Sequence, residues 1–366
     1  MSTPNNATTC PFSIARQQQH FRLLELPPDL ADTLTSPNPP TLYFKSSDST
    51  AAKPAHAVLC TPSATYRIRQ VQTSNAVYLT LPCSQLSSGA AGAESENGVV
   101  ATATCDSTLE LHKAEPTVSA EDYIRQEVTQ YDESLYDGDD DNDDTPTASS
   151  KTKTQLYSAI PLHHSTIRAA LRSLCVFDER AGGPCFLPTA QVLLKAWQAM
   201  LDAAEDAIAQ SARGPIATRS ILEPLARHAQ EAESHTPVSL YRAILLRLSA
   251  SGPDEMTADG AGESKAKTPA THLNQTETIT WLGATILSAA DPTSPLTPTA
   301  FMQAWTTALP ERWRALATLD AIQGRYTIDG DTIRSSSRAM GRDGTAAREA
   351  GAATGRNWHE KFGRRR

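Results

Sequence analysis

A short acidic run near the middle of the chain constrains the fold most, because it separates two different sequence patterns. Residues 132–144 carry eight acidic side chains in thirteen positions and no basic one. Repulsion among like charges keeps such a segment extended and solvated, so we interpret residues 132–153 as an interdomain linker. A calcium-binding loop is the disfavoured alternative, since counting from Asp137 gives neither the glycine at position six nor the glutamate at position twelve of an EF-hand loop.

The sequence before the acidic run predicts a sheet. Residues 1–20 are expected to be disordered, and a β-rich domain is expected to span residues 21–131. Tyr66 and Ile68 alternate with arginines, as in a strand with one buried face. Six short runs rich in β-branched and aromatic residues follow one another without helices between them, at residues 42–45, 57–60, 65–71, 76–81, 99–104 and 108–112. This order predicts an antiparallel sheet or partial barrel, followed by a helix that begins near Ser119.

Beyond residue 153 the hydrophobic period becomes helical. Residues 154–212 predict two short helices, then two brief strands around Gly182 and Gly183, and then a long helix from Thr189. Helix, turn, helix and hairpin is the order of a winged-helix domain. The long helix has one apolar face, formed by Leu193, Trp197, Met200, Ala204 and Ile208.

Residues 213–335 repeat this pattern and predict a second winged-helix domain. Thr297 is a favourable N-cap and Pro298 fits the first position of a helix. Asp329 and Gly330 lie between two alternating runs, which is a strong signal for a two-residue hairpin turn. The predicted fold class is therefore α+β, with an N-terminal antiparallel β-rich domain followed by mainly helical tandem winged-helix domains.

Charge is sorted along the chain. The net charge of −8 taken alone argues against binding to nucleic acid, because phosphate contacts need Lys and Arg. Residues 332–366, however, hold nine basic residues against three acidic ones, a net charge of +6. Residues 336–366 are accordingly expected to form a disordered basic tail, with a role either in phosphate attraction or in localisation.

The sequence carries no catalytic signature. It contains no Walker loop, no G-x-G-x-x-G, no G-x-S-x-G and no H-E-x-x-H motif. The six cysteines are widely spaced, which favours neither a disulfide framework nor a zinc site. No apolar run reaches the roughly 18 residues of a membrane span. We therefore expect a protein that is not an enzyme, uses no metal or cofactor, does not enter the membrane and lies in the cytoplasm or nucleus.

Several ordered blocks resemble the sister chromatid cohesion protein Dcc-one family. They are the LLEL motif at residues 23–26, the run AVLCTPSATYRIRQVQTSNAVYL at residues 57–79, residues 109–116, residues 155–187 and the run FMQAWTTALPERWRALATLDAIQGRY at residues 301–326. The pair Ser74 and Asn75 falls at the position expected from this resemblance. Together the blocks cover about two thirds of the chain in the family's order.

The resemblance implies a nuclear, non-catalytic subunit of an alternative replication factor C complex, acting in DNA replication, sister chromatid cohesion and the cell cycle. In that complex the implied partners are chromosome transmission fidelity subunits eight and eighteen, with strands of both completing the N-terminal sheet. The complex loads or unloads the sliding clamp PCNA, which makes PCNA an indirect partner, and it docks on DNA polymerase epsilon. The winged helices of the family are associated with DNA binding.

Two sets of residues are predicted to act in binding. Apolar residues of the N-terminal domain either fill its own core or join a β layer that partner strands complete: Leu23, Leu24, Leu26, Val58, Leu59, Tyr66, Ile68, Val77 and Leu79. Arginines of the winged-helix domains are predicted to contact DNA phosphates without sequence selectivity: Arg168, Arg172, Arg180, Arg312, Arg314, Arg325 and Arg334. The alternative hypothesis, independent of the resemblance, is a winged-helix transcription or chromatin protein that reads DNA sequence.

Overall fold

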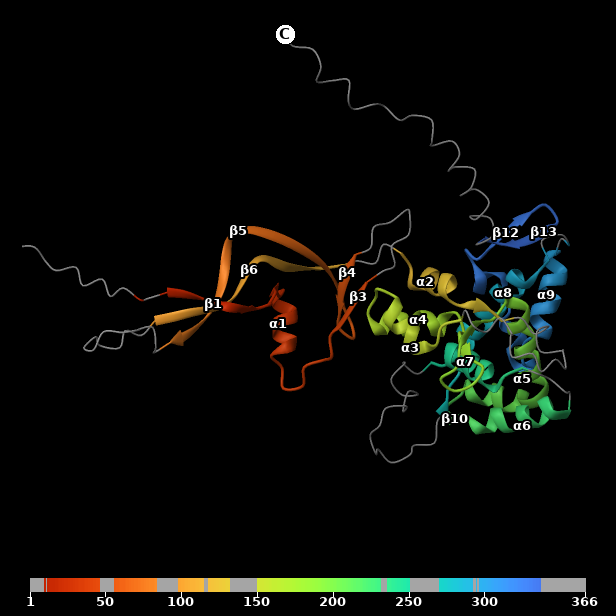
Figure 1. Ribbon diagram of the computed structural model, residues 1–366. Helices are drawn as coiled ribbons and strands as arrows, with labels where there is room; N and C mark the ends of the chain where they lie inside the picture. The colour runs from red at the N-terminus through yellow and green to blue at the C-terminus, as the bar shows by residue number, and fades with distance from the viewer. Residues whose placement is uncertain are drawn as a thin grey trace, which may run out of the picture. The chain divides into compact units, whose positions relative to one another are not determined.

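A computed structural model defines the fold of the chain, which divides into two compact units (Figure 1). The first unit comprises Met1–Ala120 and Tyr157–Arg168, and the second comprises Glu121–Leu156 and Ala169–Arg366. The structure describes residues 10, 12–46, 56–83, 98–114, 118–131, 150–231, 236–250, 270–291, 294 and 296–336. The predicted linker, residues 132–153, and the predicted basic tail, residues 336–366, fall outside these residues, except for residues 150–153 and residue 336.

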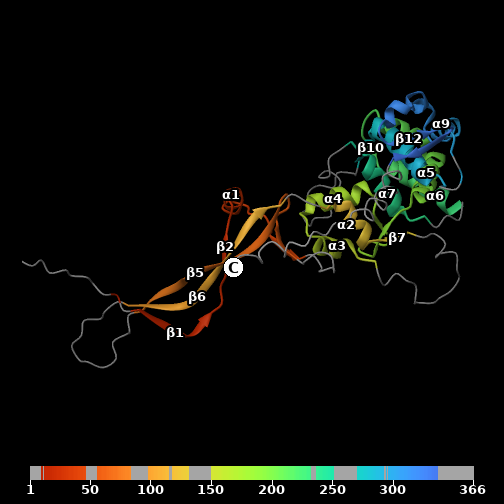
Figure 2. The same cartoon turned by 90° about the horizontal axis from the view of Figure 1, so that it is seen from above.

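The first unit is a curled, open sheet built around two long strands (Figures 1 and 2). Its strand order is β1-β6-β5-β4-β3, and β2 also pairs with β6. Strands β5 and β6 are much longer than the 5 to 6 residues of an average strand. The bounds are β1 Phe12–Gln19, β2 Leu23–Glu25, β3 Tyr43–Ser46, β4 Ala57–Cys60, β5 Thr65–Cys83 and β6 Gly98–Lys113.

Two features of this sheet differ from the sequence prediction. The sheet is mixed, because β1 and β2 both pair in parallel with β6, whereas the predicted sheet was antiparallel. The chain passes directly from β1 into β2 along one edge of β6, so both strands keep the same direction. Residues 1–20 were expected to be disordered, yet strand β1 lies within them. Its pairing with β6 supplies backbone hydrogen bonds that local sequence cannot reveal.

Helix α1, Pro28–Leu34, covers one end of the sheet and closes its small core. Leu30 of this helix packs with the strand residues Leu59, Tyr66 and Leu111, and all four are buried. The hydroxyl of Tyr66 donates a hydrogen bond to Asp29 Oδ2 at 3.0 Å, which fixes the helix over the strands. The sheet unit thus has its own core at the end where β3, β4 and β5 lie together.

The segment Tyr157–Arg168 is attached to this same unit. The ammonium group of Lys45 on β3 is buried and donates to the carbonyl oxygens of Ile160 at 3.3 Å and Leu162 at 2.7 Å. The backbone N–H of Ser165 donates to the carbonyl oxygen of Pro62 at 3.2 Å. Because a lysine carries three donors and no acceptor, backbone carbonyls are suitable partners for a buried one.

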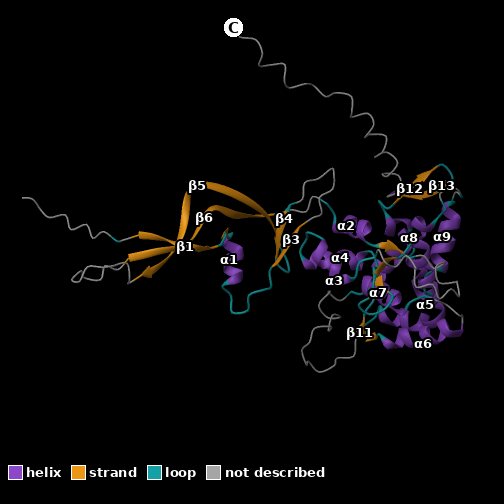
Figure 3. Cartoon of the chain, in the orientation of Figure 1, coloured by secondary structure: helices purple, strands orange, loops and turns teal. Residues whose placement is uncertain are grey.

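The second unit is mainly helical, with small sheets between its helices (Figure 3). Strands β7, β9 and β8 form a three-stranded sheet in that order, with β7 parallel to β9. The expected β-rich domain runs to residue 131, but β7 pairs within the second unit and Tyr131 belongs to its core. The elements that follow the sheet are α2 Ala120–Glu127, β7 Thr129–Gln130, α3 Lys153–Ala159, α4 His164–Ser173, β8 Phe177–Asp178 and β9 Cys185–Leu187. Helices α3 and α4 are divided between the units, because residues 157–168 belong to the first.

Two further sets of elements follow along the chain. In the first, β10 and β11 form an antiparallel pair, with bounds α5 Ala190–Ser211, β10 Ile216–Ala217, α6 Arg219–Glu231, α7 Val238–Leu248 and β11 Ala270–Thr271. In the second, β12 and β13 form a hairpin, with bounds α8 Gln275–Ala289, α9 Pro298–Thr307, the 3-10 helices η3 Glu311–Leu316 and η4 Leu319–Ile322, β12 Tyr326–Asp329 and β13 Thr332–Ser335. The predicted hairpin is confirmed, but its two-residue turn is Gly330–Asp331 and not Asp329–Gly330, because Asp329 still pairs with Thr332. Gly330 has a φ of 58°.

One hydrophobic core extends through the second unit, from Tyr131 to Ile333. Its largest fully buried side chains are Trp197 on α5 and Trp305 on α9. Each of these two indole N–H groups is satisfied, with Trp197 Nε1 donating to the Ala308 carbonyl at 2.8 Å and Trp305 Nε1 to the Ile279 carbonyl at 3.0 Å. The helices of this unit therefore share one core. With the sheet unit, this gives the mixed α+β fold that the sequence predicted.

Candidate partner-binding surface

Large apolar side chains are exposed on the sheet at the end away from helix α1. Among the described residues of β1 and β5 they are Phe12, Ile14, Val77, Tyr78, Leu79 and Leu81, which we call the exposed sheet surface. Their exposure is substantial, reaching 57% for Ile14 and 59% for Leu81. Successive residues of a strand point to opposite faces, so these side chains lie on both faces of the sheet, and a gathering of exposed apolar side chains usually marks a binding region. This half of the sheet therefore presents to solvent what a core would normally enclose.

Strand β6 lies between β1 and β5 and carries small residues at this end. Ala101 and Ala103 are fully buried. Ala101 pairs with Ile14, and Ala103 pairs with Leu79 on the opposite side. The small side chains of β6 leave its larger neighbours without a covering layer.

The sheet curls so strongly here that side chains from the two outer strands meet. Phe12 lies on β1 and Tyr78 on β5, with β6 between them. Their ring centroids are 5.8 Å apart in an edge-to-face arrangement. The curl produces a half-barrel with one open side.

The open side coincides with an unpaired edge of β5. Strand β4 pairs with β5 only at residues 65–67. From Ile68 to Cys83, no strand in the described part of the chain pairs with the edge of β5 that faces away from β6. Such an edge presents backbone N–H and C=O groups to any extended segment that can add to the sheet. Backbone groups and apolar side chains are thus available together.

The nine predicted partner-binding residues fall into different surroundings. Val77 and Leu79 lie on the exposed sheet surface, and Leu26 is exposed just after β2. Leu23 is half-buried on β2, and Val58 is buried on β4. The remaining four pack in or against the core under α1: Leu24, Leu59, Tyr66 and Ile68. Only part of the predicted set is therefore available to a partner.

Four residues of the exposed sheet surface were absent from that set. Tyr78 and Leu81 belong to a run that the sequence predicts as a strand, so periodicity alone could have included them. Phe12 and Ile14 lie in the segment expected to be disordered. Their alternation with Ser13 and Ala15 is the signal for a strand, although it extends over few residues.

Most of the predicted DNA-contacting arginines are exposed. Arg168 lies on α4, and Arg180 lies in the turn between β8 and β9. The others are at the C-terminal end of the second unit, on η3, before β12 and on β13: Arg312, Arg314, Arg325 and Arg334. Arg314 also donates from Nε to the Leu309 carbonyl at 3.3 Å.

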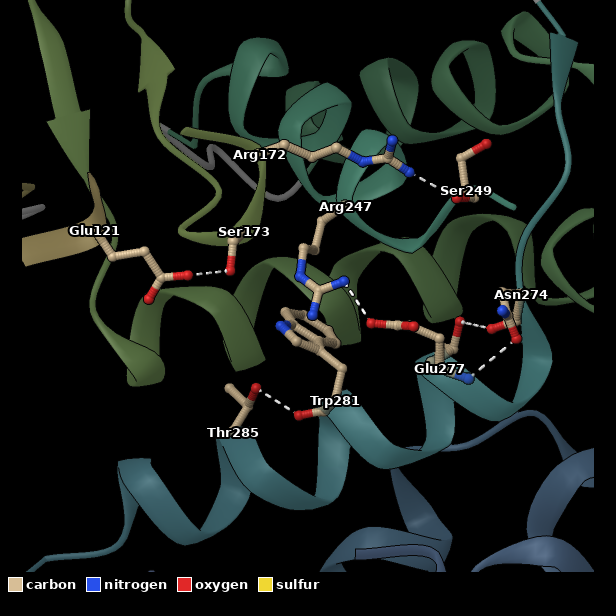
Figure 4. A network of polar contacts seen from close by, with 10 residues as sticks. Glu121, Arg172, Ser173, Arg247, Ser249, Asn274, Glu277, Trp281 and Thr285 are labelled. Carbon is tan, nitrogen blue, oxygen red and sulfur yellow. Dashed lines mark hydrogen bonds and ion pairs between the residues drawn. The ribbon is translucent and has the colours of Figure 1, made fainter. Parts of the chain in front are cut away.

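Arg172 differs from the other arginines because it points into the second unit (Figure 4). Its Nη2 donates to the carbonyl oxygen of Ser249 at 2.6 Å. Burial and the nearby Arg247 guanidinium lower the pKa of Arg172, whereas Glu277 raises it. An arginine in such surroundings serves a contact inside the protein.

The turn that carries Arg180 is held by an acidic side chain. Asp178 accepts from Lys153 Nζ at 2.8 Å and from the backbone N–H of Gly182 at 3.3 Å. Burial alone would raise the pKa of Asp178, but the Lys153 ammonium and the backbone donors bring it below its ordinary value. Both ends of the turn are thereby fixed.

Two further findings concern metal ligands and membrane spans among the described residues. Within them, no three His, Cys, Asp or Glu side chains gather as metal ligands. The helices found there are all too short or too polar to cross a membrane.

The fold and the exposed sheet surface define an α+β protein with an incomplete sheet available for assembly. The family model of sister chromatid cohesion protein Dcc1 matches residues 21–339, and the chain belongs to this family. The predicted resemblance is confirmed, and membership gives the chain a role in sister chromatid cohesion. The family is a non-catalytic component of a cohesion-associated complex, which implies a nuclear function. No curated protein matches the chain.

Proposed function

We propose that the chain is a non-catalytic subunit of the cohesion-associated alternative replication factor C complex. In this role it binds chromosome transmission fidelity subunits eight and eighteen through its sheet unit. The assembly acts in the nucleus at replication forks, where it loads or unloads PCNA and docks on DNA polymerase epsilon. Membership of the Dcc1 family supports the cohesion part of this proposal.

The observation that carries the proposal is the combination of an open edge on β5 with the exposed sheet surface. A partner strand that adds along β5 satisfies backbone groups, and its alternate side chains cover apolar ones such as Leu79 and Leu81. Burying this surface on association supplies a hydrophobic driving force of about 25 cal/mol per Å². Partner strands therefore complete the half-barrel.

Co-expression with both partner subunits tests this role. The double variant Leu79→Lys and Leu81→Lys places charges on the exposed sheet surface, and we expect it to weaken the complex by at least about tenfold. The matched control is the double variant Thr41→Lys and Ser63→Lys, two exposed neutral positions of the sheet unit outside residues 68–83 that add the same charge. The control should assemble normally. Because all four positions are exposed, the thermal stability of the isolated chain should change little in either double variant.

Two results would contradict the proposal. One is an isolated chain that stays soluble and ignores both partner subunits. The other is a Leu79→Lys and Leu81→Lys variant that assembles as well as the Thr41→Lys and Ser63→Lys control, because the exposed sheet surface would then have no part in assembly.

We further propose that the second unit contains winged-helix domains that contact DNA. The order α2-β7-α3-α4-β8-β9, with β7 beside β9, supports the assignment for the first of them. The exposed arginines Arg180, Arg312, Arg325 and Arg334 support contacts to phosphate.

Salt dependence distinguishes this mode from the alternative of a sequence-reading transcription or chromatin protein. Binding through phosphates should weaken steeply from about 50 to about 200 mM salt and should be equal for unrelated duplexes. Arg334→Ala should reduce by about 1 the steepness with which the logarithm of the binding constant falls with the logarithm of the salt concentration. Sequence-selective binding that survives the higher salt would favour the alternative.

A further inference from the structure

Arg172 connects the end of α4 to the residue after α7 through one carbonyl oxygen (Figure 4). The arginine comes from the C-terminal end of α4, and its hydrogen bond to Ser249 lies just after α7. On the next residue, the N–H of Ala250 donates to the His272 carbonyl at 2.7 Å. The N–H of Asn274 donates to the Leu248 carbonyl at 2.8 Å, so the end of α7 is fixed to the start of α8.

An ion pair reinforces this connection. Arg247 on α7 contacts Glu277 on α8, with Nη1 and Oε1 2.6 Å apart. Glu277 also lies in the first turn of α8, where its backbone N–H donates to the N-cap Asn274 at 3.1 Å. The Arg247 side chain is only 20% exposed, so solvent screens this pair less than a surface pair. We call Arg172, Arg247, Ser249 and Glu277 the arginine junction.

Helix α4, which contributes Arg172 to this junction, is itself hydrogen-bonded to α2. Ser173 follows Arg172 and donates from Oγ to Glu121 Oε1 of α2 at 2.7 Å. Helix α4 then ends in a turn in which the N–H of Val176 donates to the Leu171 carbonyl at 2.9 Å. This turn leads into β8, so the position of Arg172 is linked to that of the turn carrying Arg180.

Along the chain, the junction residues from Arg247 onward lie between Arg180, which forms the first set, and a second set of exposed arginines. Arg180 belongs to the β8–β9 turn, whereas Arg312, Arg325 and Arg334 follow α8 and α9. Groups held at a fixed spacing bind one extended ligand with a higher effective concentration than groups on loosely joined parts. A duplex is such a ligand, because its phosphates repeat along a stiff axis.

We infer that Arg172 is a positioning residue that holds the two sets of arginines at a fixed spacing, so that they act together on one nucleic-acid duplex. This inference rests on the proposed DNA contact. Arg172 itself touches protein and not phosphate. Its loss loosens the junction and leaves each set of arginines able to bind by itself.

The test compares three variants of the full chain. Arg172→Met removes the donor and keeps much of the side chain's length, and Arg172→Lys keeps the charge and one donor. The matched control is Arg242→Ala, because Arg242 lies on α7, is exposed and carries the same charge outside the junction. The first readout is hydrogen exchange at the amides of Ala250 and Asn274. The second is affinity for duplexes of about 12 and about 36 base pairs at one salt concentration.

We expect exchange at both amides to rise by at least about tenfold in Arg172→Met and to stay unchanged in Arg242→Ala. The wild-type chain should bind the longer duplex more tightly than the shorter one. The ratio of these two affinities should fall by at least about threefold in Arg172→Met. The control should weaken binding to both duplexes equally, and Arg172→Lys should fall between the wild type and Arg172→Met. The statistical advantage of a longer duplex is common to every variant and cancels in this comparison.

The two readouts separate failure of the inference from failure of the proposed DNA contact. If Arg172→Met behaves like Arg242→Ala in both measurements, the inference is overturned. If the wild-type chain binds neither duplex, the DNA contact is refuted and joint action on a duplex is refuted with it. Faster exchange in Arg172→Met would in that case still support the arginine junction.

Discussion

At the scale of single residues, Gly283 determines how closely α8 approaches α9. A Cβ atom at this position would lie 2.9 Å from two carbon atoms of the Trp305 ring and 3.0 Å from Ile322 Cγ2. These distances are shorter than van der Waals contact, and the Trp305 ring is fixed by its hydrogen bond to the Ile279 carbonyl. Glycine is thus required here for packing.

Gly283→Ala is expected to destabilise the second unit by about 1–3 kcal/mol, because the helices must separate or the ring must move. This loss outweighs the gain in helix propensity, which is about 1 kcal/mol. Chemical denaturation followed by tryptophan fluorescence measures the change. The control Ser288→Ala, exposed on the same helix, should stay within about 0.5 kcal/mol of wild type. Equal stability of Gly283→Ala and wild type would disprove the packing constraint.

The lowered pKa of Asp178 predicts that this residue makes a contribution to stability that depends on pH. Its pKa in the folded protein lies below the ordinary value, so folding favours the charged carboxylate. The contribution is present above the ordinary pKa and is lost as the pH falls towards the folded pKa. The difference in melting temperature between wild type and Asp178→Asn should be constant above about pH 5 and shrink below about pH 4. A difference that stays constant or grows towards pH 3 would contradict the assigned role of the Lys153 contact.

The surroundings of individual arginines could not be predicted from sequence. Arg168 and Arg172 lie four residues apart on α4, so helical periodicity assigns them similar positions. Arg168 is exposed, whereas Arg172 bonds to a carbonyl 77 residues further along the chain. Contacts between residues so distant depend on tertiary packing, and no local pattern contains them.

At the scale of elements, local chemistry at helix starts was a dependable guide. Thr189 and Thr297 were predicted to begin helices, and each hydroxyl accepts a hydrogen bond from a backbone N–H three residues later. The strand predicted at residues 57–60 is β4 with the same bounds. These features depend on a few neighbouring residues, which explains why the sequence alone predicts them.

Thr297→Ala provides a test of such a cap. The Thr297 hydroxyl accepts from the N–H of Ala300 at 3.2 Å, and its loss should cost about 1 kcal/mol of stability. Thr299→Ala on the same helix is the control, since Thr299 is exposed and alanine has the higher helix propensity. Thermal unfolding should place Thr297→Ala below the control. The opposite order would show that the cap contributes nothing.

At this scale, the sequence-based predictions were wrong mainly about the lengths of strands. The runs at residues 65–71 and 76–81 form the single strand β5, because the bulge between Gln72 and Val77 shifts the register without ending the pairing with β6. The two-residue strands β7, β10 and β11 were not predicted. Two residues show no period, so only pairing with a distant strand defines them.

At the scale of the whole molecule, the two units contrast in how completely they bury their apolar residues. The second unit has one continuous core that includes buried tryptophans from α5, α8 and α9. The sheet unit has a cluster of four buried core residues formed by α1 and the strands beneath it, and large apolar side chains of β1 and β5 are exposed at its other end. A sheet with open edges and uncovered apolar side chains is prone to association. This contrast is the physical basis for the adaptor role that we propose.

Hydrogen exchange along β5 and β1 tests that claim most directly, in the chain alone and in complex with chromosome transmission fidelity subunits eight and eighteen. The account predicts strong additional protection in the complex at residues 72–83 of β5, where the open edge and the exposed sheet surface coincide. Amides of β4, which already pair on both sides, should change little. Equal exchange of residues 72–83 with and without the partners would contradict an incomplete sheet that the partners finish.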